Sequence, residues 1–325
     1  MNNHEKTQAV ASISLDLDNQ WAYMKTHGDP GWDRFPSYLD CVTPRILDFF
    51  NELDCQITVF VVGKDAEQPG NQEPLAAISQ AKHEIANHSY MHEPWLHLYT
   101  PEQVTEEFDR SEAAIQQATG QRCLGFRGPG FTFSGDVLMQ MIRRGYRYDA
   151  STFPTFIGPL AKSYYLLKSQ FSREEKETRK DLFGGWQEVL RSNRPHLWDL
   201  PAGLVEIPVT TVPWFKLPFH GTYLSYLASF SEFTARRYFQ WAVTMCRLSG
   251  TEPSFLFHPL DFLDEEDCPE LAFFPGMKLE YHRKREFFAW CMRKLQRSYR
   301  LVPMREHAEK AMTSELAKLP LPQHA

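Results

Sequence analysis

The sequence predicts an α/β protein, a distorted (β/α) barrel with about seven parallel strands. Apolar strand patterns alternate with helical patterns along most of the chain, which is the order of right-handed βαβ units. The segment 56–63 is apolar and β-branched, as expected for a strand in a sheet covered on both faces. A length of 325 residues suits one barrel with a large core. We therefore expect a single domain over 8–310 and a C-terminal tail over 311–325.

The first half of the chain supplies most of the regular pattern. A strand is predicted at 10–18, where Ile13, Leu15 and Leu17 alternate with polar residues. The elements predicted after it are a helix over 43–54 with Thr43 as its N-cap, a strand over 56–63, a helix around 73–82, a strand over 83–86, a helix over 101–118 ending at Gly120, a strand over 123–126, a helix over 134–144 ending at Gly145, and a strand over 146–149. This order allows consecutive strands to run parallel.

The segment 160–199 interrupts that rhythm. It is long, charged and broken by aromatic residues, and insertions of this length are usually functional lids or unstructured connections. We expect a lid-like insertion there. Strand patterns resume at 204–213, 254–258 and 299–303, while residues 313–325 are expected to be frayed.

Composition and charge argue against two classes of protein. The formal net charge is −6 and the isoelectric point is near 6.1, whereas a nucleic-acid-binding protein would normally show a basic face. No apolar run is long enough for a secretory signal or a membrane span, so we expect a cytoplasmic protein. The six cysteines include no C-x-x-C pair and are expected to be reduced thiols. We also expect a homo-oligomer.

Two carboxylates lie at the end of the first predicted strand. Asp16 and Asp18 are two residues apart, so their side chains point to the same face. The carboxyl ends of barrel strands are where active sites are built. Carboxylates held this close repel each other unless a cation is present, which favours one metal ligand beside one free general base. The alternative is a pair of solvated aspartates at a strand end.

His88 and His92 are candidate metal ligands. Their spacing of four would place both rings on one face of a helical turn. With one carboxylate they would supply three protein ligands and leave a position for water and substrate, as in catalytic metal sites. His83 and Glu84 resemble the start of the metalloprotease motif H-E-x-x-H, but Asn87 stands where its second histidine should be. The alternative is a chance pair of histidines on a surface loop.

The segment 127–131 (RGPGF) is predicted to form a tight loop after a strand. The guanidinium of Arg127 can bind a carboxylate through two parallel hydrogen bonds, and Asp16 is the simplest target. Arg127 would then keep Asp16 ionised and oriented. The backbone N–H groups of the loop could stabilise an oxyanion. The alternative is an ordinary turn with a surface arginine.

His258 ends the apolar strand predicted at 254–258. A histidine at this position in a barrel is well placed to act as a general acid. Pro259 favours extended backbone at His258, and Asp261 could orient the imidazole. The alternative is a structural histidine.

These segments, in this order, resemble the motifs of the polysaccharide deacetylase family, carbohydrate esterase family 4. The resemblance extends over roughly 10–150 and 200–305. The matching motifs are Ser14-Leu15-Asp16-Leu17-Asp18-Asn19, His88-Ser89-Tyr90-Met91-His92, Arg127-Gly128-Pro129-Gly130-Phe131, Tyr148-Asp149-Ala150-Ser151 and Leu256-Phe257-His258-Pro259. The first motif has an extra residue between its carboxylates. This variant resembles the branch that contains peptidoglycan-deacetylase-like and cyclic-imide- or allantoin-hydrolysing members.

The resemblance implies a role for each matching residue. Asp16 is similar to the general base, Arg127 to the residue that orients the base, and His258 to the general acid. The residues that resemble the metal ligands of the family are Asp18, His88 and His92. The implied cofactor is one divalent metal ion, usually zinc in this family.

Together these features predict a metal-dependent hydrolase of carbon–nitrogen (amide) bonds, of the deacetylase type. It would remove an acyl group, by preference N-acetyl, from an amino sugar, a glycan or a glycolipid precursor. One alternative is a small-molecule amidohydrolase acting on a cyclic imide, ureide or formamide, with 160–199 closing a groove into a pocket. A second alternative is a non-catalytic metal- or ligand-binding barrel.

Several residues near predicted loop ends are expected to contact the substrate, because aromatic faces suit sugar rings and the glycine-rich loop borders the predicted site. They are Trp21, Gly128, Pro129, Gly130, Phe131, Asp149 and Asp261. The aromatic segment 212–230 could line an acyl pocket or touch a membrane surface if the substrate is lipid-linked. A core segment or an oligomer contact would explain it equally well.

Overall fold

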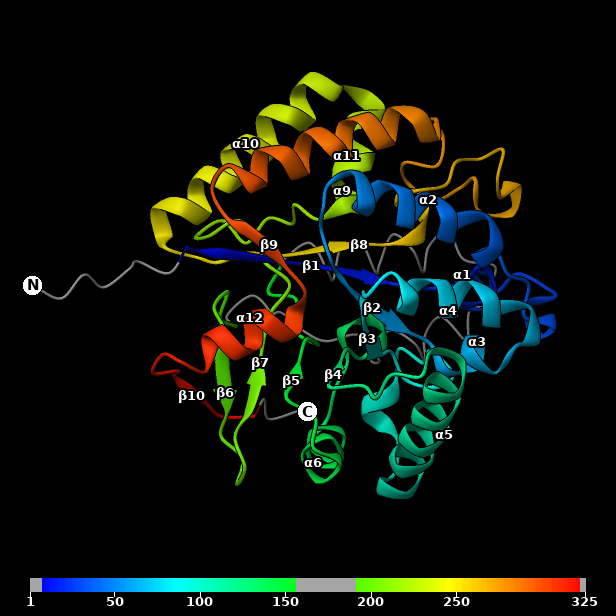
Figure 1. Ribbon diagram of the computed structural model, residues 1–325, viewed down its shortest axis with the longest axis vertical. Helices are drawn as coiled ribbons and strands as arrows, with labels where there is room; N and C mark the ends of the chain where they lie inside the picture. Colours follow the sequence, from blue (N-terminus) through cyan, green and yellow to red (C-terminus); the bar gives the residue numbers. More distant parts are fainter. Residues whose placement is uncertain (1–7, 156–190, 322–325) are drawn as a thin grey trace, which may run out of the picture.

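A computed structural model describes residues 8–155 and 191–321, and within them a curled, mostly parallel sheet forms the centre of the molecule (Figure 1). Seven neighbouring strands of this ten-stranded sheet are all parallel. In pairing order they are β7 (Leu204–Glu206), β5 (Tyr148–Asp149), β4 (Gly125–Phe126), β3 (Glu84–Asn87), β2 (Thr58–Val61), β1 (Val10–Asp16) and β8 (Ser254–Phe257). The predicted fold, a distorted (β/α) barrel with about seven parallel strands, is confirmed.

The two outer strands of this parallel set, β7 and β8, approach each other without forming a ladder. The backbone N–H of Thr210, which follows β7, donates to the carbonyl of Ser254 at 3.0 Å. The N–H of Ser254 donates in return to the hydroxyl of Thr210 at 2.8 Å. These two bonds bridge the seam of the barrel where strand pairing is missing.

Three short strands extend the sheet beyond the barrel. They are β9 (Arg300–Val302), which pairs with β1, β6 (His196–Trp198), which pairs antiparallel with β7, and β10 (Lys318–Leu319), which pairs with β6. Two expectations change as a result. Residues 196–198 of the predicted insertion belong to the sheet, while 160–190 lie outside the described residues. The predicted frayed tail is wrong at 318–319, because their pairing with β6 orders them.

Helices connect most of the strands. They are α1 (Gln20–His27), α2 (Leu39–Glu52), α3 (Gly63–Glu67), α4 (Gln72–Gln80), α5 (Pro101–Thr119), α6 (Gly135–Arg144), α9 (Gly221–Phe230), α10 (Glu232–Ser249), α11 (Tyr281–Gln296) and α12 (Met304–Ala311). Gly120 and Gly145 end α5 and α6 in the left-handed conformation, as predicted. The predicted N-cap Thr43 is wrong: α2 begins at Leu39, and Thr43 is buried within its second turn.

The strands separate a large outer core from a smaller inner one. Ile13 and Leu15 of β1, and Leu17 just after it, pack in the outer core, towards which α2, α9, α10 and α11 gather in Figure 1. The inner cluster contains Phe60 of β2 and Met304 of α12. The alternation along β1 therefore turns its polar residues towards the barrel interior.

Helix α12 lies at the amino ends of the strands. The N–H groups of Met304 and Arg305 donate to the side chains of Thr58 and Glu84, at the starts of β2 and β3. The opposite end of the barrel, at the carboxyl ends of the strands, carries the candidate site. No helix in the described ranges is long and apolar enough to cross a bilayer.

Candidate metal centre and catalytic site

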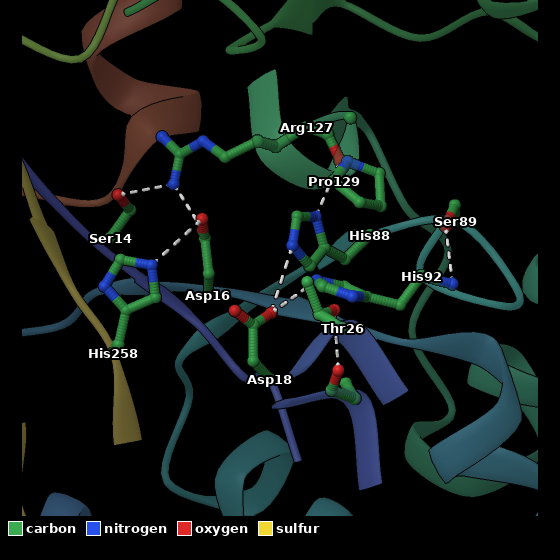
Figure 2. A network of polar contacts seen from close by, with 12 residues as sticks. Ser14, Asp16, Asp18, Thr26, His88, Ser89, His92, Arg127, Pro129 and His258 are labelled. Carbon is green, nitrogen blue, oxygen red and sulfur yellow. Dashed lines mark hydrogen bonds and ion pairs between the residues drawn. The ribbon is translucent and has the colours of Figure 1, made fainter. Parts of the chain in front are cut away.

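Asp18, His88 and His92 converge at the carboxyl end of the barrel (Figure 2). Asp18 follows β1, whereas both histidines come from the chain after β3. The Nε2 atoms of His88 and His92 lie 3.2 and 3.0 Å from Oδ1 of Asp18. One ligand atom from each residue lies within 4.8 Å of the others. The structure thus brings together the three residues that the sequence predicted as metal ligands.

The segment joining the two histidines is a folded loop, so the predicted helical turn is wrong. Ser89 and His92 have φ angles of 62° and 51°, in the left-handed region. The N–H of His92 donates to the Ser89 hydroxyl at 3.2 Å. The carboxylate of Glu107, on α5, accepts the N–H groups of Tyr90 and Met91 at 2.6 and 3.2 Å. These contacts stabilise a tight loop, so the two histidines converge without the helical turn that their spacing of four predicted.

The chemistry of these side chains fits a divalent cation. Nδ1 of His88 lies 2.7 Å from the carbonyl oxygen of Arg127. A carbonyl can only accept, so Nδ1 carries the proton and a neutral His88 presents a lone pair at Nε2. That lone pair faces the carboxylate of Asp18, an arrangement that needs a proton or a cation between the two groups. Two imidazole nitrogens and one carboxylate oxygen are ligands typical of zinc.

Buried Asp18 and His88 stabilise each other's charged forms. Burial raises the pKa of Asp18, but the charge of His92 and hydrogen bonds from both histidines outweigh it and hold that pKa well below its usual value. Burial lowers the pKa of His88, but the charges of Asp16 and Asp18 raise it above its usual value. The site therefore favours positive charge beside Asp18.

Arg127 is fully buried and contacts Asp16, the expected base, inside the barrel. Its Nη1 donates to Oδ1 of Asp16 at 2.5 Å and to the Ser14 hydroxyl at 3.1 Å, as Figure 2 shows. Its Nε donates to the carbonyl of Ala150 at 3.0 Å. The predicted contact is present, but it uses one nitrogen rather than the expected parallel pair. The other contacts fix the guanidinium in place.

His258 approaches the carboxylate oxygen of Asp16 that Arg127 does not contact. Its Nε2 is 4.0 Å from Oδ2 of Asp16. Its Nδ1 is 3.1 Å from the hydroxyl of Thr222, on α9. The expectation that Asp261 orients the imidazole or contacts substrate is not supported, because its buried carboxylate accepts the backbone N–H of His258 at 2.9 Å. Asp261 thus supports the turn after β8.

Trp21 and Asp149, both expected to contact substrate, are fully buried instead. The indole N–H of Trp21 donates to the carboxylate of Asp65 at 2.8 Å. Asp149 accepts the hydroxyl of Ser151 at 2.5 Å, and Ser151 accepts the N–H of Gly128 at 2.8 Å. Asp149 thus supports the loop after β4 through Ser151, and neither residue is exposed to a substrate. Their places at or after predicted strand ends did not reveal this burial.

The loop after β4 borders the site with mixed exposure. Pro129 is buried, whereas Gly130 is exposed and has a φ angle of 61°. Phe131 is partly buried, and its ring centroid is 5.0 Å from that of Phe153. The N–H of Phe131 donates to the carbonyl of Gly128 at 2.9 Å. Two N–H groups of this loop, those of Gly128 and Phe131, are therefore already used within the protein.

Sequence reasoning missed several supporting residues. Ser14 could have been found, because the alternation places it on the same face as Asp16. His220 precedes α9 and Thr222 lies in its first turn, 36 residues before His258, and no motif marks either residue. Their importance follows only from the packing of α9 against the end of β8.

Residues 29–148 match the family model described as polysaccharide deacetylase. Over this segment, little more than a third of its length, the chain is similar to the polysaccharide deacetylase family. The matched range contains His88, His92 and Arg127, while Asp16 and Asp18 precede it. The family match thus includes two of the three candidate metal ligands.

Two relatives with similar sequences are a peptidoglycan deacetylase and a peptidoglycan deacetylase-like protein. The chain is 28% identical to a peptidoglycan deacetylase of Helicobacter pylori over 148 residues, which are 44% of this chain and 48% of that protein. It is 34% identical to a peptidoglycan deacetylase-like protein of Gibberella zeae over 113 residues, 34% of this chain and 31% of that protein. The matches therefore span about half and a third of these relatives.

One solved structure shares the fold over almost the whole chain. It is a candidate polysaccharide deacetylase from Mycobacterium smegmatis, with a TM-score of 0.63 and 18% identity. The likeness covers 98% of this chain and 96% of that one. At this identity the likeness shows the barrel fold and no more.

Proposed function

We propose that this protein is a divalent-metal-dependent hydrolase of the polysaccharide deacetylase type, which removes an N-acetyl group from an amino sugar or glycan. One observation carries the proposal: the Asp18, His88 and His92 cluster lies beside Asp16, with His258 facing the same carboxylate. A metal site, a base and an acid at one barrel mouth are the parts that metal-assisted amide hydrolysis uses.

Asp18, His88 and His92 would hold the ion, with zinc as the preferred metal. When bound, such an ion supplies Lewis-acid activation of water and of the amide carbonyl. The hydrogen bond from His88 to the carbonyl of Arg127 would fix the orientation of one ligand ring.

The remaining steps belong to side chains and backbone of the protein. Asp16, held by Arg127, accepts the proton of the attacking water. The N–H of Gly130 is our proposed oxyanion donor, because those of Gly128 and Phe131 have partners. His258 donates a proton to the amine as the carbon–nitrogen bond breaks, since an amine leaves poorly without one.

Replacing the base tests this assignment. Asp16→Asn should lower the rate of acetate release from N-acetylglucosamine oligomers by about 10²- to 10⁴-fold, the range for a lost general base. Its content of divalent metal, measured by elemental analysis, should match wild type, because Asp16 is not a proposed ligand. Asp136→Asn, at an exposed helix position, is the matched control. Wild-type turnover by Asp16→Asn would overturn the assignment.

The two alternatives predicted from the sequence have distinct outcomes in one screen. Metal-loaded protein is offered N-acetylated sugars, cyclic imides, ureides and formamides, and the release of acetate, formate or ammonia is measured. Turnover of imides alone would favour the small-molecule amidohydrolase. A purified protein that retains no divalent ion in elemental analysis would favour the non-catalytic barrel.

A further inference from the structure

The proposed acid, His258, has an unexpected partner. An imidazolium that donates from Nε2 also carries a proton on Nδ1, and that proton needs an acceptor. The atom in contact with Nδ1 is the hydroxyl oxygen of Thr222, at 3.1 Å. The nearby carboxylate of Asp261 is occupied by the backbone N–H of His258 at 2.9 Å and the hydroxyl of Ser225 at 3.0 Å.

The start of α9 is built to bring Thr222 to this place. A Cβ on Gly221 would lie 2.2 Å from Oδ2 of Asp261, so glycine allows the helix to begin against the turn that follows β8. Asp261 also accepts the hydroxyl of Ser225, one turn further along α9. The first two turns of α9 are thus fixed to the strand end that carries His258.

The charged groups around the imidazole are few. Asp16 of β1 faces Nε2 at 4.0 Å, and the carboxylate of Asp261 interacts with the ring through its charge. The ring of His220, at the start of α9, is centred 5.8 Å from that of His258. Burial, then the charges of His258 and Arg127, hold the pKa of His220 well below its usual value. Nδ1 of His258 thus contacts an uncharged group, the hydroxyl of Thr222.

We propose that Thr222 is the positioning residue of His258. Its hydroxyl accepts the Nδ1 proton and fixes the ring with Nε2 towards Asp16 and the substrate. The Nε2 proton passes to the leaving nitrogen as the carbon–nitrogen bond breaks, and the Nδ1 proton stays on the imidazole, bonded to Thr222. This inference rests on the proposed function, because it assumes that His258 is the acid for amide cleavage.

The first test measures the tautomer of His258 and needs no activity. Long-range ¹H–¹⁵N spectra of histidine-labelled protein distinguish the two neutral forms, and His258→Gln identifies the signal among the 12 histidines. We expect the form protonated at Nδ1 in wild type and in Thr222→Ser. Thr222→Val keeps the shape but removes the hydroxyl, and should shift His258 towards the form protonated at Nε2. An unchanged His258 signal in Thr222→Val would overturn the proposal.

The second test compares substrates that do and do not need an acid. Thr222→Val should lower kcat for N-acetylglucosamine oligomers by about tenfold or more. It should leave hydrolysis of p-nitrophenyl acetate nearly unchanged, because that leaving group departs without a proton, and Thr222→Ser should restore kcat. Equal rates of Thr222→Val and wild type on the amide would overturn the positioning role. If the wild type hydrolysed neither substrate, that result would contradict the proposed function instead. The tautomer of His258 would still test whether Thr222 positions it.

Discussion

Arg127 forms a buried ion pair with Asp16 in the candidate site. Its guanidinium is fully buried between Asp16 and the ring of Phe60, whose centroid lies 4.2 Å from the guanidinium carbon. Asp16 is itself almost entirely buried. A buried ion pair gains little net stability, but removing one partner leaves the other charge uncompensated. The pair is therefore sensitive to the loss of either member.

Arg127→Met should lower the free energy of unfolding by about 3–5 kcal/mol, since it leaves the Asp16 carboxylate buried without its cation. Urea unfolding measures the difference. Arg147→Met is the control, because Arg147 pairs with Glu309 at 3.0 Å where both side chains are about half exposed. That exposed pair should contribute less than about 1 kcal/mol. Similar losses in the two variants would mean that burial does not determine the effect.

The loop after β4 shows how an element positions the site. The carbonyl of Arg127 orients His88, and the next residue, Gly128, packs against the backbone of Thr132. A Cβ on Gly128 would lie 1.7 Å from the carbonyl oxygen of Thr132. The φ angle of Gly128 is −72°, which any residue can adopt, so space rather than backbone conformation requires glycine here.

Gly128→Ala should therefore displace the loop, destabilise the fold by about 1–3 kcal/mol as in overpacked cores, and weaken metal retention through His88. Thermal unfolding and metal content after dialysis measure the two effects. Gly70→Ala is the matched control, because nothing lies within 4 Å of its added Cβ. Equal metal retention by the two variants would separate the loop from the metal centre.

Two buried histidines connect the whole molecule to pH. Burial lowers the pKa of His83 and of His307 to about 4, against about 6.5 in an unfolded chain. His83 accepts the N–H of Ile57 at its Nδ1 (3.2 Å), and His307 contacts the hydroxyl of Ser12 (2.9 Å). Between pH 6.5 and pH 4 the unfolded chain therefore binds more protons than the folded protein. The contribution of these neutral histidines to the free energy of unfolding is complete above pH 6.5 and is lost as the pH falls towards 4.

The free energy of unfolding should consequently fall between pH 7 and pH 4.5, by up to about 3 kcal/mol for each of these histidines. Urea titrations at several pH values measure the slope. The double variant His83→Gln with His307→Gln should show a shallower slope. His282→Gln, at an exposed histidine, should retain the wild-type slope. Identical slopes in both variants would place the pH dependence elsewhere.

How far the sequence predicts this molecule depends on the range of the interactions involved. The alternation at 10–18 revealed both the strand and the inward face of Asp16, because that information is local. The pairing of Lys318–Leu319 with β6 was missed, because two residues carry no pattern of their own. The burial of Trp21 was missed for a related reason: its cover comes from distant segments, including Asp65. The contact of Thr222 with His258 likewise depends on how one helix packs.

Arg127 serves both halves of the site, through its main chain and through its side chain. Its carbonyl orients His88, while its guanidinium holds Asp16. With the metal ligands and base proposed above, metal affinity and the geometry of the base should therefore be thermodynamically linked, and a double-mutant cycle across this residue should be non-additive. His92 has no such bond to Arg127 in the described residues, and its loop is held separately by Glu107. An engineer who wishes to change the metal preference without disturbing the base should therefore begin at His92.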